Sequence, residues 1–174
     1  DTTFEFEVSA APTYVSFDPD RSLLCNVRKV SGMDAEAWTQ QLKSGRGFGE
    51  KAEAVMRLSA PQTGIADLSV VTALAKDPYR GTRMLALTPF VGLSNAQQDQ
   101  VLEMALQLVD DPEADVRSNA VAYLGDGAEM LQAASRSAMK ARVIARLGRA
   151  VNDSSYGVSR LAMGTALCLV AACS

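Results

Sequence analysis

Three arginines near the C-terminal end have the spacing of an anion-binding surface. Arg142, Arg146 and Arg149 follow one another at intervals of four and three residues, so a helix places them in one stripe. Five basic residues and no acidic residue occur between positions 130 and 152. Such a stripe could face the C-terminal carboxylate of a bound peptide. The alternative, which charge runs more often satisfy, is a solvated helix face with ion pairs to the preceding segment.

Acidic residues gather in the segment before this stripe. They are Asp110, Asp111, Glu113 and Asp115. Together they could bind a cation, but they lack the glycine turn and the ligand spacing of an EF-hand loop. Carboxylates between two helices need no cation, because they cap helix ends and face solvent. We therefore expect these acids to serve as turn and capping residues.

Residues for catalysis are missing from the chain. None of its 174 residues is a histidine, so neither an imidazole base nor a histidine zinc site can be built from it alone. Ser154 and Ser155 have no neighbouring base and are expected to cap a helix. The glycines of segment 45–49 lack the preceding strand and the spacing of a dinucleotide-binding loop. We expect no catalytic residue, metal or cofactor in this chain.

Composition narrows the possible partners and the compartment. The chain is 48% hydrophobic and 21% charged, as is usual for a globular protein, and its net charge of -3 disfavours nucleic-acid binding. The longest apolar run, 161–173, is too short to cross a membrane, and no signal peptide is visible. Cys25, Cys168 and Cys173 have apolar neighbours, which favours buried thiols and a cytoplasmic location.

A repeated motif organises the last three quarters of the chain. Asp77 with Arg83, and Asp111 with Arg117, each follow the pattern Asp-Pro-x-x-x-x-Arg, and an alanine comes three residues after each arginine. Weaker copies surround Asp153, where Ser159 replaces the arginine, and Lys51, where glycine replaces the aspartate. Aligned on Ala54, Ala86, Ala120 and Ala162, the copies are 32, 34 and 42 residues apart. These periods are typical of stacked helix pairs.

This motif resembles the HEAT repeat and implies an α-α superhelix over about residues 34–172. In each pair, we expect the aspartate to cap the second helix and the proline to occupy its first position. The arginine then reaches an aspartate of the same or a neighbouring repeat, and the alanine allows close helix packing. The expected first helices are 35–43, 62–76, 95–109 and 138–151, with a short extra helix at 127–134 and a break at Pro89.

The first 30 residues have a different pattern from the rest. Apolar residues alternate with polar ones at Phe4, Phe6 and Val8, and an apolar group follows at Tyr14 to Phe17. The pattern predicts two antiparallel strands between residues 4 and 17. Two strands do not form a stable sheet alone, so we expect them to be the closing strands of a larger sheet.

The segments FEFEV and PTYVSFDPDRSLL, followed by a helical array that begins near AWTQQLKSGRGFGEKAEAVMRLS, resemble the C-terminal part of gluzincin zinc aminopeptidases. The positions that match in order are Phe4, Phe6, Val8, Pro12, Val15, Phe17, Asp18, Pro19, Leu23 and Leu24. The family's His-Glu-x-x-His zinc motif and its Gly-x-Met-Glu-Asn loop are absent here. No zinc ligand or catalytic residue of the family therefore transfers to this chain.

The resemblance implies a mainly α chain, with a β-sandwich end over 1–30 and a HEAT-like domain over 31–174. The chain alone is then inactive, and its partners are the catalytic and β-sandwich domains of a parent zinc aminopeptidase and the peptide substrate. Zinc belongs to the parent, and the helical domain restricts access to the cleft. The alternative is a stand-alone solenoid that binds other proteins.

Overall fold

The structure is a computed structural model that describes residues 5–16, 18, 32–60, 67–88, 92–127, 131 and 136–171. These residues form eight α-helices in four consecutive pairs: α1 (Ala35–Ser44) with α2 (Phe48–Leu58), α3 (Ser69–Leu74) with α4 (Arg80–Leu85), α5 (Asn95–Leu108) with α6 (Ala114–Asp126), and α7 (Ser137–Ala150) with α8 (Tyr156–Ala171). The expectation of a mainly helical chain is confirmed. None of these helices is long and apolar enough to span a bilayer.

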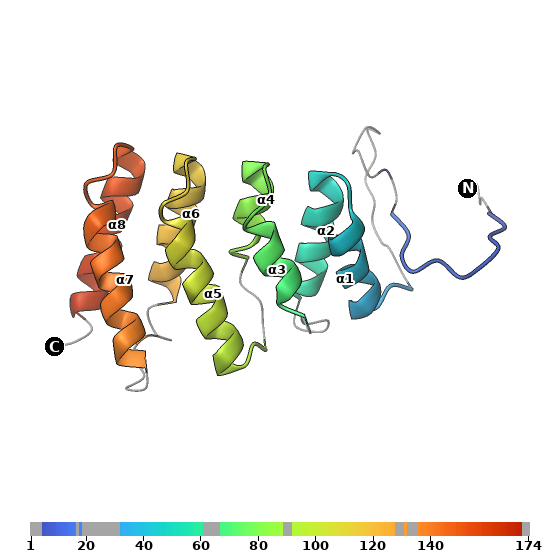
Figure 1. The fold of residues 1–174 in the computed structure, drawn as a ribbon, viewed down its shortest axis with the longest axis horizontal. Helices are drawn as coiled ribbons and strands as arrows, with labels where there is room; N and C mark the ends of the chain where they lie inside the picture. The colour runs from blue at the N-terminus through green and yellow to red at the C-terminus, as the bar shows by residue number, and fades with distance from the viewer. Residues whose placement is uncertain are drawn as a thin grey trace.

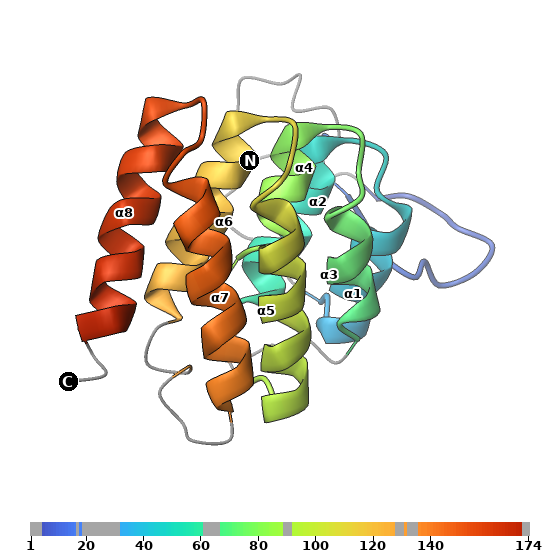
Figure 2. The ribbon, with the colours of Figure 1, turned by 60° about the vertical axis from the view of Figure 1, so that its left-hand side comes forward.

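The four pairs stand in a row, with α1 and α2 at one end and α7 and α8 at the other (Figure 1). Seen from a second direction, the first helices of the pairs lie in one layer and the second helices in another (Figure 2). Within the second layer, α2 packs on α4, α4 on α6 and α6 on α8. This arrangement agrees with the predicted stack of helix pairs, while its assignment to the HEAT type stays a prediction.

The core lies between the two layers and begins with the repeated alanines. All four have no exposed surface: Ala54, Ala86, Ala120 and Ala162. Their small side chains let second helices of adjacent pairs approach closely, and larger apolar residues fill the space beside them. The buried set contains the inward positions expected for the first helices, including Trp38 and Leu42 of α1, and Val143 and Leu147 of α7.

Most helix boundaries follow the predicted caps. The side chain of Asp34 accepts a hydrogen bond from the N–H of Ala37 and begins α1, and Gly45 ends this helix. Ser94 and Gln97 form the expected capping box at the start of α5. Helix α3 is shorter than the predicted 62–76, since it covers only Ser69–Leu74, and positions 61–66 lie outside the described residues.

The Asp-Pro turn is built differently from the prediction. Helices α4 and α6 have Tyr79 and Glu113 as their N-caps, so the prolines lie before the helices rather than at their first positions. Asp77 and Asp111 accept hydrogen bonds from the N–H groups of these N-cap residues, at 2.9 Å in both turns. The aspartate therefore closes an Asx turn ahead of the helix, because the next N–H but one is its nearest donor.

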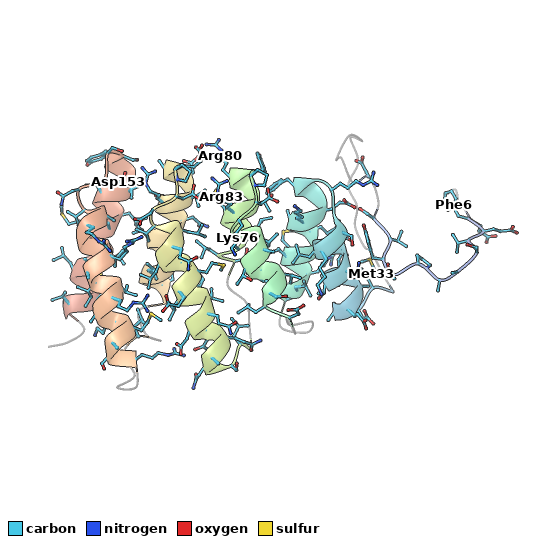
Figure 3. All side chains as sticks on the ribbon, viewed as in Figure 1. Phe6, Met33, Lys76, Arg80, Arg83 and Asp153 are labelled. Atoms are coloured by element: carbon cyan, nitrogen blue, oxygen red, sulfur yellow. The ribbon has the colours of Figure 1, made fainter. Side chains whose placement is uncertain are left out.

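The predicted strands are not confirmed. Residues 5–16 contain no strand, and position 17 lies outside the described part of the chain. Phe6 is 84% exposed, and Val8 and Val15 are also exposed. Figure 3 shows Phe6 far from the helices. A strand needs hydrogen-bonding partners, and the described residues supply no sheet that could provide them.

Several further expectations concern cysteines and connecting segments. Cys168 is exposed, so the prediction of a buried thiol is wrong at this position, because the residue lies on the outer face of α8. Cys25, Cys173 and Pro89 lie outside the described residues. Only Gly127 and Leu131 of the proposed extra helix 127–134 are described, and they do not test it.

Candidate functional site

A groove runs over the layer of first helices and lies between α3, α5 and α7. Its volume is about 830 Å³. Met104 of α5 and Met139 of α7 contribute apolar surface to it, and Lys76, Glu103 and Arg142 contribute charged groups. A pocket of this size with apolar walls and a few charged groups has the character of a binding site for a small ligand or a peptide segment.

The arginine stripe of α7 borders this groove, but its charges are largely used within the protein. Arg142 makes a two-pronged ion pair with Glu103, and Arg146 pairs with Asp110. The hydrogen bond from Arg142 lowers the pKa of Glu103. Arg149 is exposed and makes no ion pair with a described residue. Of the three predicted carboxylate-facing residues, Arg149 alone keeps an unneutralised guanidinium.

Arg136 holds one end of the groove together. Its side chain is buried, and its Nε lies 3.0 Å from Oδ1 of Asp99. Its Nη2 donates hydrogen bonds to the carbonyl of Asn95 and to Oε1 of Gln98. Arg136 thus ties the start of α7 to the first turn of α5. The sequence marked this residue only as part of a basic run, since nothing in its spacing indicates burial.

Lys76 is the groove residue whose charge is most available. It follows α3 directly, it is exposed, and no ion pair joins it to the described residues. Figure 3 shows it in the central part of the array. An ammonium group beside apolar methionine surface suits a ligand that has both a carboxylate and an apolar side chain. The groove can therefore bind and orient, whereas no described arrangement in it provides a nucleophile with a base.

The repeated aspartates and arginines form a ladder of ion pairs between consecutive helix pairs. Lys51 binds Asp77 at 2.7 Å. The guanidinium of Arg83 then donates to both carboxylate oxygens of Asp111, at 2.7 and 2.8 Å. Arg117 makes the same bidentate contact with Asp153, again at 2.7 and 2.8 Å. Each basic residue therefore contacts the aspartate of the next pair, which is one of the two partners that the sequence allowed.

Each ladder arginine also closes its own turn. Nη1 of Arg83 donates to the carbonyls of Asp77 and Pro78, and Nη1 of Arg117 donates to those of Asp111 and Pro112. Because a guanidinium has five donors in a fixed fork, one side chain can serve two carboxylate oxygens and two carbonyls. The four predicted structural residues are thus brought together along one edge of the array, where Figure 3 shows Arg83 and Asp153.

The ladder shifts the protonation of its aspartates. Burial alone would raise the pKa of Asp77 and of Asp111, but hydrogen bonds from Lys51 and Arg83 outweigh it and lower both values. For Asp153, the hydrogen bond from Arg117 is the main cause of a lowered pKa. All three carboxylates are therefore held in the charged form that the ion pairs require.

The acidic cluster after α5 is consumed by these and similar ion pairs. Asp110 binds Arg146, Asp111 binds Arg83, and Asp115 binds Arg80. No group of three or more histidine, cysteine, aspartate or glutamate residues is placed to hold a metal ion in the described part of the chain. The expected turn role agrees with these contacts.

Comparison with protein-family models, with curated proteins and with solved structures found no match to this chain.

Proposed function

We propose that this chain is the non-catalytic C-terminal segment of a cytoplasmic zinc aminopeptidase. In this proposal, the parent enzyme's other domains hold zinc and remove the N-terminal residue of a peptide. The helical array forms a wall beside their cleft and excludes large folded substrates. The order of the matching positions between Phe4 and Leu24, directly before the helices, supports this assignment.

The observation that carries the proposal is the state of the N-terminal segment. Residues 5–16 have the alternating pattern of a strand, yet they form no strand and expose the apolar side chains of Phe6, Val8 and Val15. Apolar residues with strand spacing become buried when the strand joins a sheet. In our proposal, the β-sandwich of the parent supplies that sheet.

The groove gives the helical wall a role in handling peptides. In the proposed enzyme, the exposed charges of Lys76 and Arg149 draw the C-terminal carboxylate of a short peptide toward the array. The paired Arg142 and Arg146 keep the shape of the groove instead. Replacing Lys76 and Arg149 by glutamine in the full enzyme then raises KM for short peptides at low salt and leaves kcat nearly unchanged. Equal KM values for enzyme and variant, at both low and high salt, would contradict this role.

The parentage is tested on the gene and on the isolated chain. The reading frame upstream of Asp1 should encode a His-Glu-x-x-His motif and a downstream glutamate, because the zinc site lies before the β-sandwich in this family. The chain by itself should not hydrolyse an aminoacyl fluorogenic substrate with or without zinc. An open reading frame without that motif, or zinc-dependent hydrolysis by this chain, would refute the proposal.

The second candidate is a stand-alone scaffold that binds an extended segment of another protein in the groove. The juxtaposition of Met104 and Met139 with Lys76 favours it, because it provides apolar and ionic contacts to a peptide on one surface. Under this hypothesis, a peptide library panned on the chain yields binders with an apolar residue next to an acidic one. Their affinity then falls at least tenfold for Lys76→Glu, whereas Lys140→Glu, a change on α7 outside the groove, leaves it unchanged.

A further inference from the structure

The last helix pair exposes apolar side chains on the side that faces away from the array. On α8 these are Met163, Leu167 and Val170, of which Met163 is 50% and Leu167 is 65% exposed. The other sides of α8 are covered, since the helix packs against both α6 and α7. Figure 1 places α7 and α8 at the end of the row, beyond which no described helix lies.

The repeat indicates what this surface does in the other pairs. Val55, Leu87 and Val121 occupy the position of Met163 in the first three copies. Each of these three is buried, with 4% exposure or less. Beside Val121, a side chain at Gly125 would meet that of Thr165 on α8, so this side of α6 faces the next pair. The Met163 position is therefore one that a following helix normally covers.

The first helix of the last pair shows the same change. On α5, Asp99, Glu103 and Asp110 bind arginines of α7. The corresponding residues of the last pair, 42 positions further on, are Ala141, Ala145 and Asn152, and all three are exposed. The Asp-Arg ladder also stops here, because Ser159 takes the place of the arginine. The positions that face outward from the last pair thus carry no charge.

We call the surface formed by Ala141, Ala145, Met163, Leu167 and Val170 the end face. Its exposed residues are small or apolar, and the nearest exposed arginines, Arg149 and Arg160, have side chains long enough to reach solvent. A surface without charges is self-complementary, because two copies can meet on it without placing like charges together. An exposed apolar surface of this kind marks an interaction site.

The opposite end of the array has a different character. Asn119 of α6 contacts α4, and Thr165 of α8 lies against Gly125 of α6, so these positions face the preceding pair. The residues in their places on α2 are Glu53 and Arg57, and Arg57 lies over the ring of Trp38. A head-to-tail contact would therefore set these two charges against an apolar surface, which costs free energy unless both are paired.

We propose that the end face binds the end face of a second copy of this chain, in a two-fold symmetric dimer. Helices α7 and α8 are about 21 and 24 Å long, since they rise 1.5 Å per residue. With helix axes about 10 Å apart, the two cover on the order of 500 Å² of flat area before side-chain relief is counted. That lies near the low end of the roughly 800 Å² per partner of a stable interface. Gly164, which has open space around its missing side chain, lets the two copies of α8 approach closely.

The oligomeric state in solution tests this inference. In sedimentation equilibrium, the chain should have twice its mass of 18.5 kDa at micromolar concentrations. Leu167→Glu should weaken dimerisation at least tenfold, because it places a charge at the centre of the contact. Ala141→Arg provides a second variant at an exposed helical position whose folding is secure. Met56→Glu is the matched control, because Met56 is an exposed methionine on α2, outside the end face.

Crosslinking locates the contact. A chain with Cys25→Ser and Cys173→Ser keeps Cys168, which is exposed on α8, and a short bis-maleimide should link two such chains. The link should disappear with Leu167→Glu and persist with Met56→Glu. A monomer at all concentrations up to a few hundred micromolar would overturn the proposal. A dimer that Met56→Glu disrupts as much as Leu167→Glu does would also overturn it.

Discussion

At the scale of single residues, the contacts of Arg83 distinguish structural ion pairs from surface ones. Arg83 and Asp111 keep only 11% and 5% of their side chains exposed, while Arg80 and Asp115 keep 55% and 61%. Both pairs connect α4 to the next helix pair. An ion pair in water gains little, because solvent screens it, whereas an unpaired buried charge is costly.

Replacing the two arginines should therefore have unequal effects. Arg83→Ala leaves Asp111 buried without its partner and should lower the free energy of unfolding by about 3 kcal/mol. Arg80→Ala should lower it by about 0.5 kcal/mol or less. Urea unfolding, followed by circular dichroism, measures both. Equal losses for the two variants would show that the ladder is no stronger than a surface ion pair.

The ladder aspartates also predict an acid sensitivity. Their pKa values are lower in the folded protein than in the unfolded chain, where an aspartate titrates near about 3.9. Their stabilisation is therefore complete above that value and is lost as the pH falls through the folded pKa values. The free energy of unfolding should fall steeply below about pH 4. Asp111→Asn should be less stable at pH 7 and should lose less on acidification, and an unchanged slope for it would contradict this assignment.

At the scale of helices and turns, the sequence was informative wherever a local contact decides the structure. Asp34, the Ser94–Gln97 box and Gly45 set helix ends that could be predicted to within a residue or two. The Asp-Pro turn could not, because the choice between capping and an Asx turn depends on the direction in which the chain enters the helix. The burial of Arg136 likewise depends on the packing of α7 against α5, which a single sequence does not reveal.

Two glycines show opposite roles in neighbouring kinds of structure. A side chain at Gly45 would come within 2.7 Å of the carbonyl oxygen of Gln41, whereas one at Gly148 would meet nothing within 4 Å. Gly45→Ala should therefore destabilise the protein by about 1–3 kcal/mol, because the backbone has to move. Gly148→Ala should stabilise it by about 0.5–1 kcal/mol, because alanine favours a helix interior. Thermal unfolding of the two variants measures both effects, and a shift in the same direction would disprove this contrast.

At the scale of the whole molecule, four helix pairs form a stack held by buried alanines and by ion pairs that run from each pair to the next. The stack could be predicted from the repeat, because its residues recur at regular positions. The groove could not, because its residues come from α3, α5 and α7 and share no motif. The N-terminal strands were predicted from a local pattern, but a sheet also requires partner strands, and the described residues do not include them.

The central claim is that the chain works as part of a larger zinc enzyme. The most direct measurement is immunocapture of the native protein from its own cells with an antibody against residues 35–171, followed by intact mass and activity assays. The account predicts a polypeptide much heavier than 18.5 kDa that contains zinc and removes N-terminal residues from peptides until a chelator is added. A native protein of 18.5 kDa, or a larger one without zinc-dependent peptidase activity, would contradict it.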